Sequence, residues 1–501
     1  MIRSVVLPLA VLMLAPTIFA DRLAAWDFDV RDFGAVGDGE TLDTKAIQAA
    51  IDRCAAKGGG RVVLARGRVY LSGGLVLKSN VTLYVDAGSA LRGSLNKDDY
   101  PDITPQIPYL YRDRFTRHLI YAEKQHNIGI AGRGTIDGQG VHEVFDHQKS
   151  PGDKDRPYIL RFAECEHVLV RDVTLLESAR WCSHYLACQD VVIDGITIRS
   201  SPRANRDGID IDSCDRVRIS NCLVETGDDA IVLKATAHRP CRNVTVTNCN
   251  LSSQAAAFKL GTESNGGFES IVMSNCTIYD TGGSGIALLM VDGAALDGVA
   301  ISNVSMENAG TPIFIRLGNR ARPMPDEDPP GMGSMRDIVI SGVEARGAGP
   351  VGCAISGIPG EYIQNLTLRD IRIRFAGGGT LEDAKEPVPE KETQYPSQRM
   401  FGTLPAYGMF IRHVRNLAVD GLDLSYDPEV GEQRPAIVLD DVIDAHLTKL
   451  HTAAVEQMPP IRMVNCQGAL SIEESPGAGC ARGARDRDER YSRPSARGDC
   501  R

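Results

Sequence analysis

The sequence predicts an all-β protein built as a parallel β-helix, a solenoid with a capping helix at its N-terminal end. Three observations carry this prediction. Short stretches of alternating apolar and polar residues recur about every 20–30 residues along most of the 501-residue chain. Glycine is frequent, at 50 residues, whereas aromatic residues make up only 6% of the chain, which is typical of turn-rich β proteins. One amphipathic helical pattern precedes the repeats.

The first twenty residues, MIRSVVLPLAVLMLAPTIFA, are typical of a secretory signal peptide. An early Arg3 precedes an apolar run, and the small residue Ala20 ends it. A membrane anchor is the alternative interpretation, but the run is short for a span of about 20 residues. We therefore expect residues 1–20 to be a signal peptide. The mature protein would then have no membrane span and would be secreted or periplasmic.

The segment DTKAIQAAIDRCAAKGGG, residues 43–60, is the expected capping helix. Asp43 or Thr44 can cap its N-terminus, and Gly58 can end it. Its apolar residues fall on one face at helical spacing: Ile47, Ala50, Ile51 and Cys54. Because the coils of a solenoid contact only their neighbours, an open end needs such a cover.

The strands of the repeat are expected where Val, Ile and Leu alternate with polar residues around a two-residue bend, as in VRISNCLV (217–224). The residues that follow six successive bends are 23, 26, 27, 27 and 28 positions apart: Val173, Ile196, Cys222, Cys249, Cys276 and Val304. This period predicts short strands stacked ~4.8 Å apart in successive coils. Leucine-rich repeats have a similar period, but their Leu/Asn consensus is absent.

Cys222, Cys249 and Cys276 are interpreted as an inward-facing stack of small apolar residues. A disulfide or metal role is the alternative, but the thirteen cysteines include no CxxC pair and no zinc-like spacing with histidine. The glycosylation-like Asn-x-Ser/Thr triplets also lie at bends and are interpreted as part of the repeat. They begin at Asn80, Asn243, Asn275, Asn303 and Asn365.

The β-helix is expected to form one domain over residues 21–475. The Arg-, Gly- and Pro-rich residues 476–501 are predicted to be disordered. Insertions break the period at 97–122, 139–160, 318–336 and 376–408. Insertions in repeat proteins often flank the binding face. Their aromatic and cationic side chains could line a cleft or lie on the surface: Tyr109, Tyr111, Arg112, Tyr158, Arg320 and Arg322.

NRDGIDID (205–212) and GDDAIVLK (227–234) contain three aspartates. Asp207 lies about one coil before the adjacent pair Asp228 and Asp229. Stacking these segments with AAAFKLGT (255–262) brings Asp207, Asp228 and Asp229 together where the strands begin. Carboxylates held this close cannot all ionise normally, so at least one pKa should rise. A protonated carboxyl beside ionised ones can cleave a glycosidic bond, with an acid for the leaving oxygen and a base for water. Asp-Gly turns and half of a calcium site are the alternatives.

The segments WCSHYLACQDVVIDGITI, NRDGIDIDSC and GDDAIVLK, in this order, resemble the pectin-cleaving glycoside hydrolases of family 28, the polygalacturonase family. The resemblance runs from DFGAVGDGETLDTKAIQAAI (32–51) to about residue 320. It implies a right-handed β-helix and metal-free hydrolysis with inversion, without a cofactor. It also implies that Asp228 is the general acid and that Asp207 and Asp229 activate water. An inverting enzyme is expected to hold the acid and base carboxyls ~6.5–9.5 Å apart.

Two departures from the family concern the substrate. The family's GHG motif aligns with Ala255, Ala256 and Ala257, and its cationic RIK motif aligns with residues 287–289, so its histidine and cations are missing. The loss leaves endo or exo action, and galacturonan or rhamnogalacturonan as substrate, open. The candidate substrate-binding residues are Asn205, which matches the family, and Lys234, Lys259, Glu263, Arg316, Arg320, Trp181 and His184, which lie nearby.

The expected partner is therefore a polysaccharide or oligosaccharide that contains uronic acid, bound by a monomer. The formal net charge of −10 argues against a nucleic-acid partner. A β-helix polysaccharide lyase is one alternative function, although a lyase would need calcium and a basic residue. A non-catalytic carbohydrate-binding adhesin is another, although the fold alone would not require three clustered aspartates.

Overall fold

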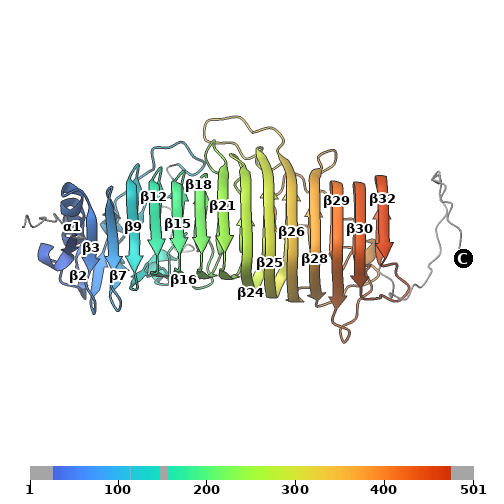
Figure 1. The fold of residues 1–501 in the computed structure, drawn as a ribbon, viewed down its shortest axis with the longest axis horizontal. Coiled ribbons are helices and arrows are strands. Elements are labelled where there is room, and N and C mark those ends of the chain that lie inside the picture. The colour runs from blue at the N-terminus through green and yellow to red at the C-terminus, as the bar shows by residue number, and fades with distance from the viewer. Residues whose placement is uncertain (1–25, 113, 147–155, 475–501) are drawn as a thin grey trace, which may run out of the picture.

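The chain folds as a right-handed parallel β-helix, as predicted, with its coils stacked along one long axis (Figure 1). The computed structural model describes residues 26–112, 114–146 and 156–474. The signal peptide predicted at 1–20 and the disordered tail predicted at 476–501 lie outside these residues. The described strands join one sheet of 32 strands in which successive coils pair in parallel.

Strands of successive coils stack on one another in three columns. The first column contains β1 (Asp27–Asp29), β3 (Gly60–Leu64), β6 (Val81–Val85), β9 (His126–Gly132), β12 (Glu166–Arg171), β15 (Gln189–Asp194), β18 (Asp215–Ser220) and β21 (Cys241–Thr247). The second contains β2 (Asp38–Leu42), β4 (Val69–Ser72), β7 (Ala90–Gly93), β10 (Thr135–Asp137), β13 (Thr174–Leu176), β16 (Thr197–Arg199), β19 (Leu223–Thr226) and β22 (Asn250–Ser253). The third contains β5 (Leu75–Val76), β8 (His118–Glu123), β11 (Tyr158–Ala163), β14 (Ser183–Leu186), β17 (Ile209–Asp212), β20 (Ile231–Lys234) and β23 (Ala256–Leu260).

Later strands run through several columns without a break. They are β24 (Phe268–Met290), β25 (Ala295–Leu317), β26 (Ser334–Ala348), β28 (Ile363–Phe375), β29 (Met409–Tyr426) and β30 (Ile437–Thr452), with the shorter β27 (Cys353–Ser356), β31 (Ile461–Val464) and β32 (Gln467–Glu474). Short 3₁₀ turns occur at Val30–Phe33, Lys97–Asp99, Glu143–Phe145 and Asp383–Lys385. The predicted insertions correspond to the long connections between strands.

The capping helix α1 (Thr44–Ala56) covers the N-terminal end of the solenoid, and its predicted apolar face is buried. Asp43 is the N-cap residue, but its carboxylate does not cap the helix. It instead accepts the backbone N–H groups of Val36 and Gly37, at 2.7 and 3.0 Å. The helix is therefore tied to the preceding turn by this carboxylate. Among the described residues, no helix is both long and apolar enough to cross a membrane.

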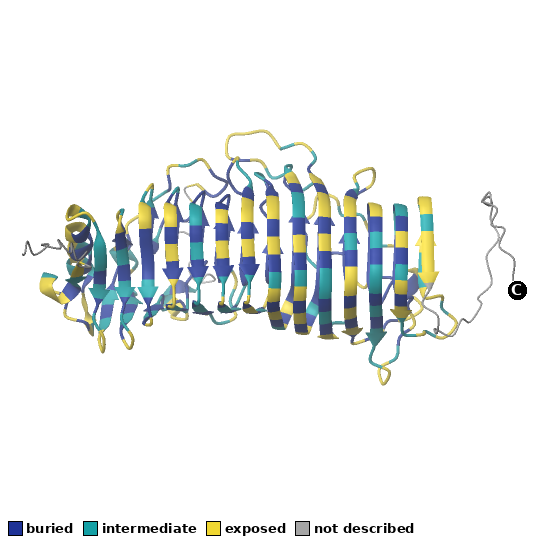
Figure 2. Cartoon of the chain, in the orientation of Figure 1, coloured by how far each residue is buried: buried dark blue, intermediate teal, exposed yellow. Residues whose placement is uncertain are grey.

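The core runs through the whole solenoid, because alternate residues of each strand point inward (Figure 2). Cys222, Cys249 and Cys276 are buried in it, which confirms the predicted inward stack. A second row of buried cysteines was not predicted: Cys165, Cys188, Cys214 and Cys241. The cysteines of the described residues are free thiols.

Bend residues between the columns adopt left-handed backbone conformations, which explains why Asn recurs there. The first residues of the five triplets at Asn80, Asn243, Asn275, Asn303 and Asn365 have positive φ angles of 53–65°. The side chains of bend residues also form rows between coils. Asn365 donates to Asp337 at 2.7 Å and accepts from Asn416 at 2.9 Å. The triplets therefore belong to the repeat geometry.

Candidate active site

Three stacked strands of the third column, β17, β20 and β23, carry the candidate site. Their register matches the stacking predicted from the sequence. The paired inward residues are Ile209, Ile231 and Phe258, and the paired outward residues are Asp210, Val232 and Lys259. Asp212 and Lys234 pair in the next outward position. Charged side chains of adjacent coils therefore point to the same side.

Two glycines let the aspartates lie close to the neighbouring coils. A Cβ at Gly208 would stand 2.5 Å from the carbonyl oxygen of Ala230, and one at Gly227 would stand 2.4 Å from the backbone nitrogen of Arg203. A larger residue at either position would push the adjacent backbone away. The glycines beside Asp207 and Asp228 are thus required by close packing of the coils.

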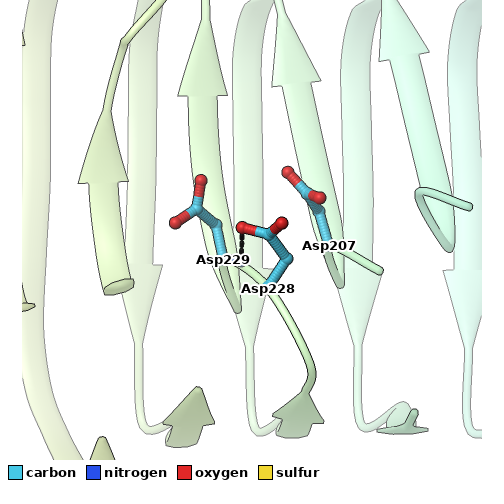
Figure 3. A group of neighbouring side chains, drawn as sticks. All are labelled: Asp207, Asp228 and Asp229. Carbon is cyan, nitrogen blue, oxygen red and sulfur yellow. Dashed lines mark hydrogen bonds between the residues drawn. The ribbon is translucent and has the colours of Figure 1, made fainter. Parts of the chain in front are cut away.

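Asp207, Asp228 and Asp229 form one cluster, with one oxygen of each within 4.8 Å of the others (Figure 3). Asp228 accepts the backbone N–H groups of Asn205 and Asp229, at 2.7 and 3.1 Å. It is more exposed than the other two aspartates, which are buried. The closest approach of the oxygen atoms is not the distance between the whole carboxyl groups, so the ~6.5–9.5 Å separation of the acid and base carboxyls stays a prediction.

Burial and mutual repulsion shift these carboxyl groups, as the spacing predicts. Burial raises the pKa of Asp207 well above its ordinary value, and the charges of Asp210 and Asp228 add to the shift. Burial, followed by the charge of Asp229, raises the pKa of Asp228. Burial also raises the pKa of Asp210 to about 8, although Lys234 opposes the shift. Burial therefore favours the protonated forms of Asp207, Asp210 and Asp228.

Two lysines lie against the carboxylates. Lys259 Nζ donates to Asp229 Oδ2 at 2.7 Å. Lys234 Nζ lies 3.5 Å from Asp207 and from Asp210, and 4.4 Å from the centre of the Trp181 ring. Burial would lower the pKa of Lys234, but the surrounding carboxylates, led by Glu263, outweigh it and raise the value.

The three aspartates are the group with metal-like spacing in the part of the chain that the structure describes. A divalent cation placed between them would approach the ammonium groups of Lys259 and Lys234, which already supply positive charge. The donor set is therefore better matched to protons and lysines than to a metal ion.

Side chains from distant connections complete a pocket of about 180 Å³. Tyr111 Oη donates to Glu263 at 2.7 Å, and Thr262 Oγ1 donates to Tyr395 Oη at 3.0 Å. The guanidinium of Arg180 lies over the ring of Phe115. The lining residues are Tyr111, Arg114, Phe115, Arg180, Trp181, Asn205, Asp207, Asp228, Asp229, Lys234, Lys259, Glu263 and Tyr395.

Residues 78–391, more than half of the chain, match the family model described as Glycosyl hydrolases family 28. The chain belongs to glycosyl hydrolase family 28. Residues 28–94 also match the model described as Rhamnogalacturonase A/epimerase, pectate lyase-like.

Curated relatives of this family 28 protein include a probable polygalacturonase of Vitis vinifera, 32% identical over 261 residues, with 48% of this chain and 52% of the relative covered. An exo-poly-α-D-galacturonosidase of Dickeya chrysanthemi is 26% identical over 334 residues, with 56% and 55% covered. The chain thus spans about half the length of these two relatives. The solved structure of an exopolygalacturonase from Thermotoga maritima has a TM-score of 0.61 at 21% identity, over 79% of this chain and 92% of that one, which shows a shared fold.

Three predicted binding residues of this family 28 protein do not line the pocket. His184 is buried beside Trp181, with Nε2 3.1 Å from Asp212 Oδ2, and burial lowers its pKa to about 4. Arg320 lies behind the pocket wall, where its Nε donates to Asp292 at 2.9 Å. These side chains support lining residues rather than face the aspartates.

Arg316 was expected to replace the missing substrate-binding cations, but it lies elsewhere. Its guanidinium donates to the carbonyl oxygens of Gly357 and Glu390, at 2.7 and 2.6 Å. Arg412, one further coil along, donates to the carbonyl oxygen of Val388 at 2.8 Å. Both arginines therefore anchor the connection between β28 and β29. Arg316 is not among the residues that line the pocket.

The outer face is covered on both sides of the pocket. On the N-terminal side, one apolar cluster joins Trp181 and Leu186 to Tyr109, Leu110, Tyr111 and Phe115. On the C-terminal side, Met400, Phe401 and Leu404 pack over a second apolar cluster. That cluster contains Ala256, Ala287, Leu289 and Phe314 from the strands. Among the described residues, the coils that carry the aspartates thus lie between two covered stretches.

Sequence reasoning missed four lining residues: Arg114, Phe115, Arg180 and Tyr395. All four come from long connections or from the segment before β14, where no period fixes the path of the chain. Tyr395 lies in a predicted insertion, and an aromatic residue in such a polar segment could have indicated a pocket residue.

Proposed function

We propose that this chain is a glycosidase that hydrolyses α-glycosidic bonds of pectin-type polysaccharides, galacturonan or rhamnogalacturonan. The observation that carries the proposal is the cluster of Asp207, Asp228 and Asp229 in a pocket that also contains Lys234 and Lys259. Raised pKa values supply a proton donor beside ionised carboxylates, which is what glycosidic cleavage needs. Similarity to a probable polygalacturonase and to an exo-poly-α-D-galacturonosidase supports galacturonan as the substrate.

In the proposed mechanism Asp228 is the general acid. It is the most exposed of the three, and its raised pKa keeps a proton available for the leaving oxygen. Asp207 and Asp229 hold and activate the water, and the reaction inverts the anomeric carbon without a metal. Family membership supports inversion. Product analysis by NMR decides the stereochemistry, because retention would make one aspartate a nucleophile instead of a base.

We propose exo action, because the coils on both sides of the pocket are covered. A site that cleaves within a polymer must let the chain leave in two directions. Here Phe115 packs with Trp181 on one side and Tyr395 bonds to Thr262 on the other, so the pocket suits a chain end.

The test is digestion of homogalacturonan, rhamnogalacturonan and oligouronides, with products analysed by mass. Exo action should release one small product from the start, with little early loss of viscosity. A ladder of oligomers would contradict exo action, and an unsaturated, UV-absorbing product blocked by EDTA would identify a lyase instead. Tyr395→Ala should shift the products toward longer oligomers, because it opens one wall while leaving the aspartates in place.

The location and assembly are also proposals. Residues 1–20 direct export to the periplasm or the medium, and the mature protein acts as a monomer on its polysaccharide. N-terminal sequencing of the mature protein and light scattering would test both statements. An unprocessed N-terminus, or a dimer mass, would contradict them.

A further inference from the structure

Lys259 holds one of the two aspartates assigned to the water. It lies on β23, one coil beyond Asp229, and 11% of its side chain is exposed. Its Nζ donates to Asp229 Oδ2 at 2.7 Å, and the backbone N–H of Ala256 donates to Oδ1 at 3.1 Å. Both oxygens of Asp229 are therefore held from the same strand.

The other two aspartates are held differently. Asp228 accepts only backbone N–H groups among its hydrogen bonds within the described residues. Asp207 has one oxygen without a hydrogen-bond partner there, and its nearest ammonium, Lys234, stands 3.5 Å away. A charge-assisted bond at 2.7 Å favours the ionised form of a carboxylate more than a contact at 3.5 Å. Asp229 is thus the better placed of the pair to remove a proton from water.

We propose that Lys259 is a positioning residue that fixes Asp229 as the general base, and that Asp207 only orients the water. This inference rests on the proposed hydrolase function. It also reassigns Lys259, which the sequence suggested as a contact for the substrate carboxylate. The negative charge of Asp229 offsets the positive charge of the Lys259 ammonium, so the pair attracts the carboxylate of a substrate only weakly.

Other charged groups also face this pair. Asp228 adjoins Asp229 in the chain, Asp207 and Asp210 face it from the preceding coil, and Lys234 faces it from β20. Tyr395 and Glu263 face Lys259 from the two connections beside it. Since carboxylates outnumber ammonium groups around Asp229, removal of Lys259 leaves a more negative site.

The first experiment compares Lys259→Met with Lys259→Arg, and uses the exposed Lys449→Met as a matched control that removes a similar Lys–Asp pair. At pH values on the acidic side of the activity profile, Lys259→Met should lower kcat at least ~10-fold and change KM little. The acidic limb of its kcat/KM profile should move up by about 1–3 pH units, the usual effect of a nearby opposite charge. Lys259→Arg should retain the wild-type limb, and Lys449→Met should match the wild type throughout.

Two results would overturn the inference. A raised KM with unchanged kcat would make Lys259 a substrate contact, since uniform binding acts on KM. An unmoved acidic limb in Lys259→Met would show a merely structural role.

The second experiment does not depend on activity. In a double-mutant cycle of Lys259→Met and Asp229→Asn, the loss of Tm in the double variant should be smaller than the sum of the two single losses. Additive losses would overturn the pairing. Absence of hydrolysis by the wild-type protein would instead overturn the proposed function, while the cycle still decides whether the pair exists.

Discussion

Two neighbouring stretches of one outer face differ in what their side chains do. In the first, β17, β20 and β23 point charged residues outward, including Asp210 and Lys259. In the second, β24, β25, β27 and β29 continue the same row of stacked positions with apolar residues. The row reads Asp210, Val232, Lys259, Ala287, Phe314, Ala354 and Phe410.

The backbone is the same in both stretches, since the strands pair in parallel without a break in this row. The charged stretch is left open as a pocket, whereas the apolar stretch is covered by residues 400–406. The inward rows therefore build the solenoid, and the outward row decides which coils line a pocket and which pack against a connection.

The largest effect should follow from Asp228→Asn in the open stretch. The change keeps the shape and removes the acidic proton, so kcat should fall by ~10²–10⁴, the usual contribution of general acid–base catalysis. A substrate with a good leaving group should be less affected, because it needs little protonation. The control is Asp297→Asn, which removes a surface carboxylate on β25 that pairs with Arg336 of β26. Full activity of Asp228→Asn would show that the charged stretch is not catalytic.

In the covered stretch, Phe314→Ala should act as a core mutation although the residue points outward. Phe314 is 1% exposed beneath the connection. Its truncation should cost about 3–5 kcal/mol of unfolding free energy, as for other buried Phe residues. Val272 on β24 is 39% exposed, and Val272→Ala should cost about 1 kcal/mol or less. Equal losses in denaturant titrations would mean that the connection does not seal this stretch.

A smaller effect should come from His184, which precedes Asp210 in the row. Burial lowers its pKa to about 4, below the ordinary ~6.5, so the unfolded chain binds a proton that the folded chain does not. Its stabilising contribution is complete above ~6.5 and should decline by about 1.4 kcal/mol per pH unit as the pH falls from there toward 4.

The variant His184→Gln should flatten this pH dependence of unfolding, and KM should stay near the wild-type value. The same pH slope in both proteins would assign the acid sensitivity to another group. A strongly raised KM would return His184 to the substrate site.

The solenoid and the aspartate cluster could be predicted because the period fixes which residues stack. Asp207 and Asp229 are 22 residues apart in the chain but one coil apart in space, and the alternation places both at strand starts. Arg316 could not be assigned in this way, because its partners, such as Glu390, lie in an aperiodic connection. Tyr395 was missed for the same reason, since a path that closes over another coil leaves no periodic signal.

The rows of bend amides restrict how such a chain can change in length. The side-chain amide of Asn365 accepts a hydrogen bond from Asn416 in the following coil and donates one to Asp337 in the preceding coil. These hydrogen bonds form only when each coil has the number of residues that brings the bend residues into line. Deleting one residue between two bends would break the row and turn apolar side chains outward, because the alternation has a period of two. Loss or gain of a whole coil preserves both relations. Length changes within the coils should therefore come in steps of a complete turn, whereas connections such as 376–408 are free to vary by single residues.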